Sequence, residues 1–400
     1  MLQSEFYINV SNARKVWLII RRAISFAHLL GLHHELDDVG DKLALRRRTL
    51  WLHLWQRDRE LSLVLGLPYA ISDSHFSITT VKNDDSGPWT EKHLLRDLPI
   101  AMGHIIDRNQ DRSKMTYSVT LKIDQELEDC RKIMSVSWWE TLPGPHMSLD
   151  AICTMFVAKM MFYNVRKLLH LPYMLKSYTD HRYDSSRIVA LECSREVIKV
   201  FQVLRDEKRS VLKMCDMVDF QVFCAAMILV LDLLGHSRSP AHHDPYQEER
   251  DWEIVYGITQ DLKRISHSMI CSVATQAARL LEDFYNARHG YSASGEDTYE
   301  VDIPYFGKVR IRRDQRFAPW RRSALTSQLD SQLQTPQEVT ENTFESSVDP
   351  LVSIDSYFHS LPGAFQPWQG VETDWASMFD LSVGDDWSWF PNGTEPQGGR

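Results

Sequence analysis

The sequence predicts an all-α fold, in which a helical array over residues 1–322 is followed by an acidic tail over residues 323–400. The first observation behind this prediction is periodicity, because apolar residues recur at three- and four-residue intervals through most of the body. The second is composition: 43% of the 400 residues are hydrophobic and 25% are charged, enough for one large core or two modest ones. The alternation of apolar and polar residues that marks strands is scarce.

The first predicted helix lies between residues 11 and 31. Its periodic apolar residues are Val16, Ile20, Ala23, Ile24, Ala27 and Leu30. Ser11 precedes them as the expected N-cap, because its hydroxyl accepts a hydrogen bond from a backbone N–H of the first turn. Gly31 is the expected end, since glycine adopts the left-handed conformation that follows many helices.

A second predicted helix begins with three consecutive arginines, Arg46 to Arg48, and ends at Gly66. Its periodic apolar residues are Leu50, Trp51, Leu54, Trp55, Leu61 and Leu65. Pro68 prevents continuation because proline has no backbone N–H to donate. We expect the two helices to pack together through leucines and tryptophans.

These helices carry an ordered series of short motifs. In chain order they are Ala27-His28-Leu29-Leu30-Gly31-Leu32-His33, Arg46-Arg47-Arg48, Leu50-Trp51, Asp58-Arg59, Leu61-Ser62-Leu63, Gly66-Leu67-Pro68 and Ile71-Ser72-Asp73. The series resembles the fungal-specific transcription factor domain, the middle homology region of fungal zinc binuclear cluster regulators. A second, weaker resemblance is to a short segment often found near the end of such domains, and it lies at Ile303-Pro304-Tyr305-Phe306-Gly307. The resemblance covers roughly residues 1–310 and implies an α-helical superhelix with a regulatory role.

Two features depart from the family pattern. An arginine is common in the family where Leu67 stands, and the chain begins almost at the first signature helix, where family members carry a long preceding segment. In these regulators that segment holds six cysteines, with pairs two residues apart, which bind two zinc ions and present a helix to DNA. The six cysteines here are never closer than nine positions. We therefore expect no cofactor in this chain, and zinc only if a cluster lies upstream of Met1.

The scattered cysteines are instead expected to be buried free thiols in a reducing compartment. They are Cys130, Cys153, Cys193, Cys215, Cys224 and Cys271. The longest apolar run, Val222 to Leu231, is too short to cross a bilayer, so no membrane segment is expected.

Further helices are predicted in the second half of the body. Ser148 is expected to open one that runs through Leu168 and is closed by Pro172. The later ones are expected at Ser185–Leu204, Val211–Leu234, Glu249–Ile265 and His267–Ala287, separated by short turns.

The tail from Ser323 is expected to be mostly disordered, because polar and acidic residues dominate it. It holds twelve acidic residues and one arginine, a net charge of −11, which leaves about +2 for the body when subtracted from −9. Acidic charge keeps its many aromatic residues accessible, so the segment Asp374–Leu381 is expected to enter a coactivator groove as an amphipathic helix. The candidate coactivator-binding residues are Trp375, Met378, Phe379, Trp387, Trp389 and Phe390. The alternative is that these aromatic residues dock on the body.

Basic residues gather again just before the tail. They are Lys308, Arg310, Arg312, Arg313, Arg316, Arg321 and Arg322. They form a candidate nuclear import signal, with an electrostatic dock for the acidic tail as the alternative.

No catalytic constellation is evident, and we expect no enzyme. The sharpest contrary signal is Asp37-Asp38-Val39-Gly40-Asp41, which matches the aspartate-rich magnesium motif of helical terpene cyclases. The second metal motif of those enzymes is incomplete at Asn83-Asp84 with Glu91, because Gly87 stands where a serine or threonine is required. Adjacent histidines at His33-His34 and His242-His243 cannot easily chelate one ion.

The sequence therefore predicts a fungal transcription activator of carbon use or secondary metabolism, located in the nucleus. It would recruit a coactivator or the general transcription machinery, and it would reach DNA through a missing zinc cluster or a partner. The alternative is a helical interaction protein that forms homodimers or heterodimers without activating. A magnesium-dependent terpene cyclase is the remote alternative.

Overall fold

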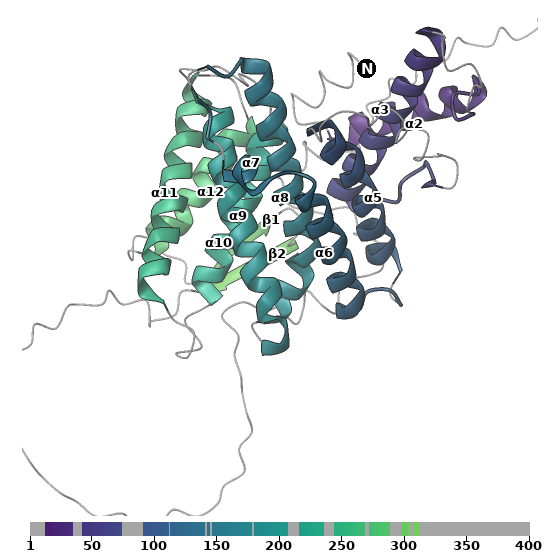
Figure 1. Cartoon of the computed structure of the whole chain (residues 1–400). Coiled ribbons are helices and arrows are strands. Elements are labelled where there is room, and N and C mark those ends of the chain that lie inside the picture. The colour runs from purple at the N-terminus through teal and green to yellow at the C-terminus, as the bar shows by residue number, and fades with distance from the viewer. Residues whose placement is uncertain are drawn as a thin grey trace, which may run out of the picture. The chain divides into compact units, whose positions relative to one another are not determined.

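The computed structural model describes the helical body and one hairpin (Figure 1). The described residues are 13–34, 42–73, 91–111, 113–140, 142–144, 146–177, 180–206, 216–235, 244–268, 272–288, 298–303 and 307–312. They fall into two compact units, which meet in sequence at residues 141 and 142, apart from the first two residues of α10. Each unit is described by itself.

The first unit is a series of helices in which each packs on the next. It contains α2 (Ala13–Leu29), α3 (Lys42–Leu65), α5 (Glu91–Gln110), α6 (Tyr117–Lys132) and the short α7 (Val136–Glu140). Helix α2 packs against α3, α3 against α5, and α5 against α6. The core holds most of the apolar residues predicted from periodicity, including the fully buried Val16 and Trp55, whereas Leu30 and Leu50 are exposed.

Two glycines end α2 and α3 in the same way. Gly31 and Gly66 have positive φ angles of 65° and 66°, a conformation that costs other residues more. The N–H of Leu32 donates to the carbonyl of Ala27, and the N–H of Leu67 donates to that of Ser62. Each of these hydrogen bonds joins residues five positions apart, as in a Schellman motif. The two Gly-Leu pairs of the sequence are therefore helix C-caps.

The second unit is built around helices that are buried on several sides. It contains α8 (Leu149–Ser177), the 3-10 turn η2 (His181–Tyr183), α9 (Asp184–Leu204), α10 (Asp216–Gly235), α11 (Pro245–Ser268) and α12 (Ser272–Arg288). Helix α8 packs along α9, and α11 packs along α12. Almost every described side chain of α10 is buried, which explains why its sequence is apolar without a polar face.

The helix predicted to begin at Ser148 is present, but the prediction that Pro172 closes it is wrong. Ser148 does cap it, since its hydroxyl accepts from the N–H of Ala151 at 3.2 Å. Helix α8 then continues through Pro172 to Ser177. The neighbouring Leu171 and Tyr173 are buried, and the packing of this stretch outweighs the hydrogen bond that proline removes.

A two-stranded antiparallel hairpin follows the helices. Strand β1 (Thr298–Ile303) pairs with β2 (Gly307–Arg312). The register places Val301 opposite Val309, while Asp302 lies opposite Lys308 and Glu300 opposite Arg310. This hairpin is not predicted by the sequence pattern, although the segment Ile303–Gly307 that joins the two strands resembles the end of the family's domains.

The predicted helical fold class is confirmed for the described residues. Helix α9 begins and ends within one residue of its predicted bounds, and α3 begins four residues before the predicted arginine triplet. The single superhelical domain over residues 1–322 stays a prediction. Ser11 and the tail 323–400 lie outside the described residues.

Candidate functional site

The signature motifs meet in the turn that follows α3. Two carbonyl oxygens of this turn accept hydrogen bonds from side chains of three helices. Gln110 of α5 donates to the carbonyl of Gly66 at 2.9 Å, and Ser62 of α3 donates to that of Pro68 at 3.2 Å. Arg21 of α2 donates to the same Pro68 carbonyl. The Gly-Leu-Pro motif is therefore a turn whose backbone polar groups are satisfied by its neighbours.

Asp58 holds the backbone just beyond that turn. Its side chain is fully buried, and Oδ2 accepts from the backbone N–H of Ala70 at 2.6 Å and of Ile71 at 3.1 Å. The Nε of Arg21 lies 3.4 Å from the other carboxylate oxygen. Burial raises the pKa of Asp58 despite the opposing effects of Arg21 and the two amides. The carboxylate thus ties α2 and α3 to the segment after the turn.

Arg59 lies beside Asp58 in sequence and is equally buried. Its Nη2 lies 2.7 Å from Oδ1 of Asp73 and 3.2 Å from the carbonyl oxygen of Ile71. The guanidinium carbon lies 3.8 Å from the centroid of the Tyr69 ring. Arg59 is therefore paired, hydrogen-bonded and stacked at once, which is the arrangement that makes a buried charge tolerable.

Gly103 of α5 provides the space that Arg59 occupies. A Cβ built on Gly103 would lie 1.5 Å from Nη1 of Arg59, so no other residue fits without displacing the guanidinium. Nη1 also donates to the carbonyl of Pro99 at 3.4 Å. Sequence reasoning missed Gly103, because its partner is more than forty positions away and no local pattern marks it.

The middle arginine of the triplet also has a structural role. Nη2 of Arg47 donates to the carbonyl oxygens of Leu30 and Gly31, both at 3.1 Å. These carbonyls lie at the end of α2, where unpaired acceptors and the helix dipole favour a cation. Arg47 therefore caps α2, whereas Arg46 is exposed.

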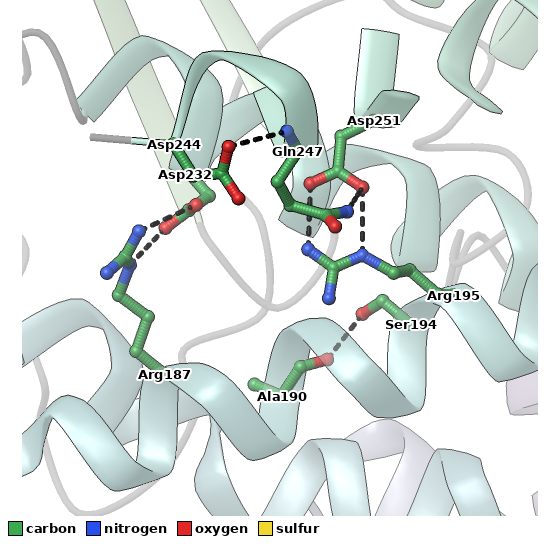
Figure 2. Close-up of polar contacts among 8 residues, drawn as sticks. All are labelled: Arg187, Ala190, Ser194, Arg195, Asp232, Asp244, Gln247 and Asp251. Atoms are coloured by element: carbon green, nitrogen blue, oxygen red, sulfur yellow. Dashed lines mark hydrogen bonds and ion pairs between the residues drawn. The ribbon is translucent and has the colours of Figure 1, made fainter. Parts of the chain in front are cut away.

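In the second unit, arginines of α9 pair with aspartates of two other helices (Figure 2). Arg187 forms two hydrogen bonds with Asp232 of α10, and Arg195 forms two with Asp251 of α11, both at 2.8 Å. Gln247 adds a hydrogen bond of 3.0 Å to Asp251. The hydrogen bonds with Asp251 raise the pKa of Arg195.

A third pair of the same kind is fully buried. Arg205, just beyond α9, lies 2.6 Å from the carboxylate of Asp219 in α10. Arg187 and Arg195 each donate to both oxygens of their carboxylate, whereas Nε and Nη2 of Arg205 both donate to Oδ1 of Asp219. These contacts fix how far the helices are displaced along one another. All three carboxylates are committed to arginines, so the arrangement is suited to holding helices and not to acid or base catalysis.

Lys167 of α8 is buried without a carboxylate among its hydrogen-bond partners. Its Nζ donates to Oδ1 of Asn164 at 2.7 Å and to the carbonyl of Gln221 at 3.5 Å. Burial lowers the pKa of Lys167 to about 8. A buried amine of this kind is a nucleophile only where substrate can reach it, and Lys167 is 2% exposed.

The described residues offer no metal centre. No group of three or more histidine, cysteine, aspartate or glutamate side chains within the described ranges is placed to hold an ion. Glu91, taken from the cyclase motif, instead accepts a hydrogen bond from the Trp138 indole at 2.8 Å. Its companions Asp37-Asp38 and Asn83-Asp84 lie outside the described residues.

The four cysteines within the described ranges are free thiols. Cys193 and Cys224 are buried free thiols, as predicted, while Cys130 and Cys153 are half-buried. Burial raises the pKa of Cys130 and of Cys224 to about 12. Cys215 and Cys271 lie outside the described residues.

The predicted tail and import residues are placed only in part. Lys308, Arg310 and Arg312 lie on β2, where the register sets the first two opposite acidic positions. The others lie outside the described residues: Arg313, Arg316, Arg321, Arg322, Trp375, Met378, Phe379, Trp387, Trp389 and Phe390. None of the described helices is both long and apolar enough to span a membrane.

Residues 1–120 match the family model of the fungal specific transcription factor domain. This range contains the whole Asp58–Arg59 network and Gly103. The match therefore falls on the part of the chain where charged side chains hold an irregular segment of backbone.

The chain also resembles curated fungal proteins over most of its length. It is 28% identical over 355 residues to the "Dehydrocurvularin biosynthesis regulator" of Aspergillus terreus, covering 80% of this chain and 48% of the relative. It is 29% identical over 349 residues to the protein of that name from Alternaria cinerariae, covering 78% and 45%. With "Transcription factor sdnS" of Sordaria araneosa it shares 29% identity over 294 residues, covering 69% and 37%.

The chain thus spans about half the length of the first two relatives and less of the third. No solved structure matches it.

Proposed function

We propose that this chain regulates transcription of a fungal secondary-metabolite gene cluster, because residues 1–120 match the family model of the fungal specific transcription factor domain. Two of the relatives are named as regulators of dehydrocurvularin biosynthesis and a third as a transcription factor. These names support secondary metabolism over carbon use as the field of regulation. The family is one of transcription factors, so the prediction that the chain is not an enzyme is confirmed and the terpene cyclase alternative is discarded.

The observation that carries the proposal is the network around Asp58 and Arg59. Residues that the sequence shows as separate motifs in two helices and a turn come together in the first unit. Gly103 of α5 leaves the space that Arg59 occupies there. The carboxylate of Asp58 and the guanidinium of Arg59 are engaged with backbone groups and with Asp73. It supports a scaffold that presents surfaces to partners.

The proposed mechanism is recruitment by the acidic, aromatic tail. Trp375, Met378 and Phe379 would be the anchors of an amphipathic helix that enters a groove of a coactivator or of the transcription machinery. Fusing residues 323–400 to an unrelated DNA-binding domain tests this directly. The fusion should drive a reporter, and Trp375→Ala with Phe379→Ala should abolish the signal.

The matched control removes aromatic residues elsewhere in the tail. Phe344→Ala with Phe365→Ala should leave most of the reporter signal, because these residues lie outside the segment Asp374–Leu381. A silent wild-type fusion, or equal losses in both variants, would contradict the activation mechanism.

Nuclear location and DNA targeting belong to the same proposal. The basic positions from Lys308 to Arg322 would direct import, and DNA would be reached through a zinc cluster encoded upstream of Met1 or through a partner protein. Mapping the 5′ end of the transcript distinguishes these routes by the presence or absence of an in-frame six-cysteine cluster. A fluorescent fusion that stays nuclear after Arg321→Gln and Arg322→Gln would argue against that part of the import signal.

The second candidate function is a helical interaction or dimerisation protein that does not activate transcription. Exposed apolar side chains on α2 and α3, Phe26 and Leu29 among them, favour it. A silent tail fusion combined with a stable dimer in solution would support this candidate.

A further inference from the structure

Helix α2 is apolar on two opposite faces. Val16, Ile20 and Ile24 are buried against the unit. On the other side, Phe26 is 62% exposed and Leu29 is 83% exposed. A helix needs only one apolar face to pack on its own domain, so the outer face is left for another occupant.

The start of α3 extends this outer face. Arg47 donates to the carbonyl of Leu30, which sets the first turns of α3 beside the end of α2. Leu43 precedes Arg47 by one helical turn and is also exposed. We refer to the combined area as the α2–α3 surface, and its residues are Arg22, Phe26, Leu29, Leu30, Leu43 and Arg46.

The charged side chains of the surface itself, Arg22 and Arg46, are both basic. The segment that joins the two helices carries Glu35, Asp37, Asp38 and Asp41 and lies outside the described residues. Helix α2 carries four lysines and arginines, and α3 carries four more between Lys42 and Gln56, with no aspartate or glutamate in either stretch. The first acidic residue of α3 is Asp58, which is buried and engaged. An apolar surface with a basic rim complements an acidic segment that carries apolar anchors.

We propose that the α2–α3 surface binds the segment Asp374–Leu381 of this same chain. The segment places Trp375, Met378 and Phe379 at the spacing of one helical face, with Asp374 and Asp380 beside them. The region around it, residues 323–400, has a net charge of −11. Contact would therefore bury apolar side chains on both partners and pair acidic with basic residues at the edge.

The tether permits this contact. About sixty residues separate Arg312, the end of β2, from Asp374, and at about 3.3 Å per extended residue they reach as far as roughly 200 Å. Binding within one chain is also intramolecular, so its effective concentration is set by the length of the link and not by the protein concentration. A modest affinity is then enough to keep the segment bound.

Two other occupants fit less well. A second copy of the α2–α3 surface would bring Arg22 and Arg46 of one copy toward the same basic residues of the other. The basic positions of β2 are less suited to the tail, because Lys308 and Arg310 lie opposite Asp302 and Glu300 in the hairpin register. Nucleic acid would use the arginines but would gain nothing from exposed leucines.

This inference deepens the proposed function, because its occupant is the candidate activation segment, but the contact itself does not require that the segment activate. Site-directed photo-crosslinking in the full chain tests it. A benzophenone analogue of phenylalanine replaces Phe379, and the crosslinked peptides are mapped by mass spectrometry. The expected result is an intramolecular crosslink to α2 or to the first turns of α3.

Matched surface variants identify the contact. Phe26→Ser with Leu29→Ser should reduce the crosslink yield by about tenfold, as expected when two apolar contacts are lost. Leu121→Ser with Ile188→Ser, which changes exposed apolar residues of α6 and α9, should leave the yield unchanged. Arg22→Glu should also reduce the yield, and Lys122→Glu on α6 should not. All six positions are exposed, so circular dichroism should show intact folding in every variant.

Other outcomes overturn the proposal. These are a crosslink to β2 or to another helix, a crosslink found only in covalent dimers, no crosslink at all, or equal losses in the test and control variants. The reporter assay on residues 323–400 is independent of the α2–α3 surface. A crosslink with a silent reporter would keep the docking contact and remove the activation mechanism, whereas an active reporter with no crosslink would do the reverse.

Discussion

The two units use buried charge in different ways. In the first, Asp58 and Arg59 bond to backbone groups of the segment that follows α3, such as the amide of Ala70 and the carbonyl of Ile71. In the second, arginines of α9 bond to carboxylates of other helices, as Arg195 does to Asp251. One arrangement fixes an irregular connection, and the other fixes the relative position of regular helices.

This difference explains where a recognisable sequence pattern arises. A connection held through its own backbone requires particular residues at short, fixed spacings, and the distance from Asp58 to Asp73 along the chain is only fifteen positions. A pair such as Arg187 and Asp232 spans forty-five positions and leaves no local pattern. The family match over residues 1–120 covers the first arrangement and not the second.

The largest expected effect comes from breaking the first arrangement at Arg59. Arg59→Met should lower the free energy of unfolding by about 3–5 kcal/mol, because it leaves a carboxylate and two carbonyls without their buried partner. Urea denaturation followed by circular dichroism measures this loss. The control is Arg57→Met on the same helix, whose pair with Glu60 is partly exposed, and it should cost about 0–1 kcal/mol. Equal costs would contradict the role given to Arg59.

Lys167 offers a test of an uncompensated charge in the second unit. Its pKa is lowered from 10.5 to about 8, so between these pH values the folded protein binds fewer protons than the unfolded chain and stability rises with pH. At 1.36 kcal/mol per pKa unit, the wild type should gain about 3 kcal/mol relative to Lys167→Met as pH rises from below 8 to above 10.5. Denaturation midpoints of both proteins across this range measure the gain. If the difference between the two midpoints stays constant across this pH range, the pKa of Lys167 is not lowered in the folded protein.

Substitution by alanine is expected to change stability in opposite directions at Gly103 and at Gly257. Gly103→Ala places a methyl group against Arg59 and should cost about 1–3 kcal/mol. Gly257→Ala in α11 meets no atom within 4 Å and should stabilise the protein by about 0.5–1 kcal/mol. Thermal unfolding of the two variants checks the pair, and a stabilising Gly103→Ala would refute the close approach of Arg59.

A double-mutant cycle measures the interaction between Arg195 of α9 and Asp251 of α11. Arg195→Met and Asp251→Asn, alone and together, should give a coupling energy of about 1 kcal/mol, since the pair is two-pronged but only partly buried. A coupling near zero would mean that the pair adds nothing to the packing of α9 on α11.

The smallest effect is expected for the titration of Asp58, because the two amides and Arg21 oppose the burial that raises its pKa. A raised carboxyl pKa means that the folded state binds the proton more tightly, so stability contributed by Asp58 grows as pH falls from neutral toward the ordinary carboxyl range. The difference in unfolding free energy between wild type and Asp58→Asn should therefore shift in favour of the wild type on acidification. A shift in the other direction would contradict the stated pKa direction.

Periodicity was enough to predict most helices, because packing requires it. The bounds predicted for Ser185–Leu204 nearly coincide with α9. Pro172 misled the prediction of α8, because the local cost of proline is offset by buried neighbours that the sequence does not reveal. The hairpin was missed although Tyr299, Val301 and Ile303 alternate with polar residues, as expected of a strand.

The site was less predictable than the fold. The Asp58-Arg59 and Gly66-Leu67-Pro68 motifs were recognised as a pattern, but their roles as backbone anchor and helix cap follow only from geometry. The fit between Arg59 and Gly103 joins two helices and depends on the absence of a side chain. Lys167 looks in sequence like any lysine of an amphipathic helix, and its burial arises from the packing around it.

Hydrogen exchange at the amides of Ala70 and Ile71 tests whether buried charge holds the segment after α3, because Asp58 is the acceptor for both. If buried charge holds this segment, both amides exchange only when the first unit unfolds, and Asp58→Ala raises their exchange rates by at least about a hundredfold while the amides of α9 are unchanged. Rapid exchange of these two amides in the wild type, or no change in Asp58→Ala, would show that Asp58 does not hold this segment.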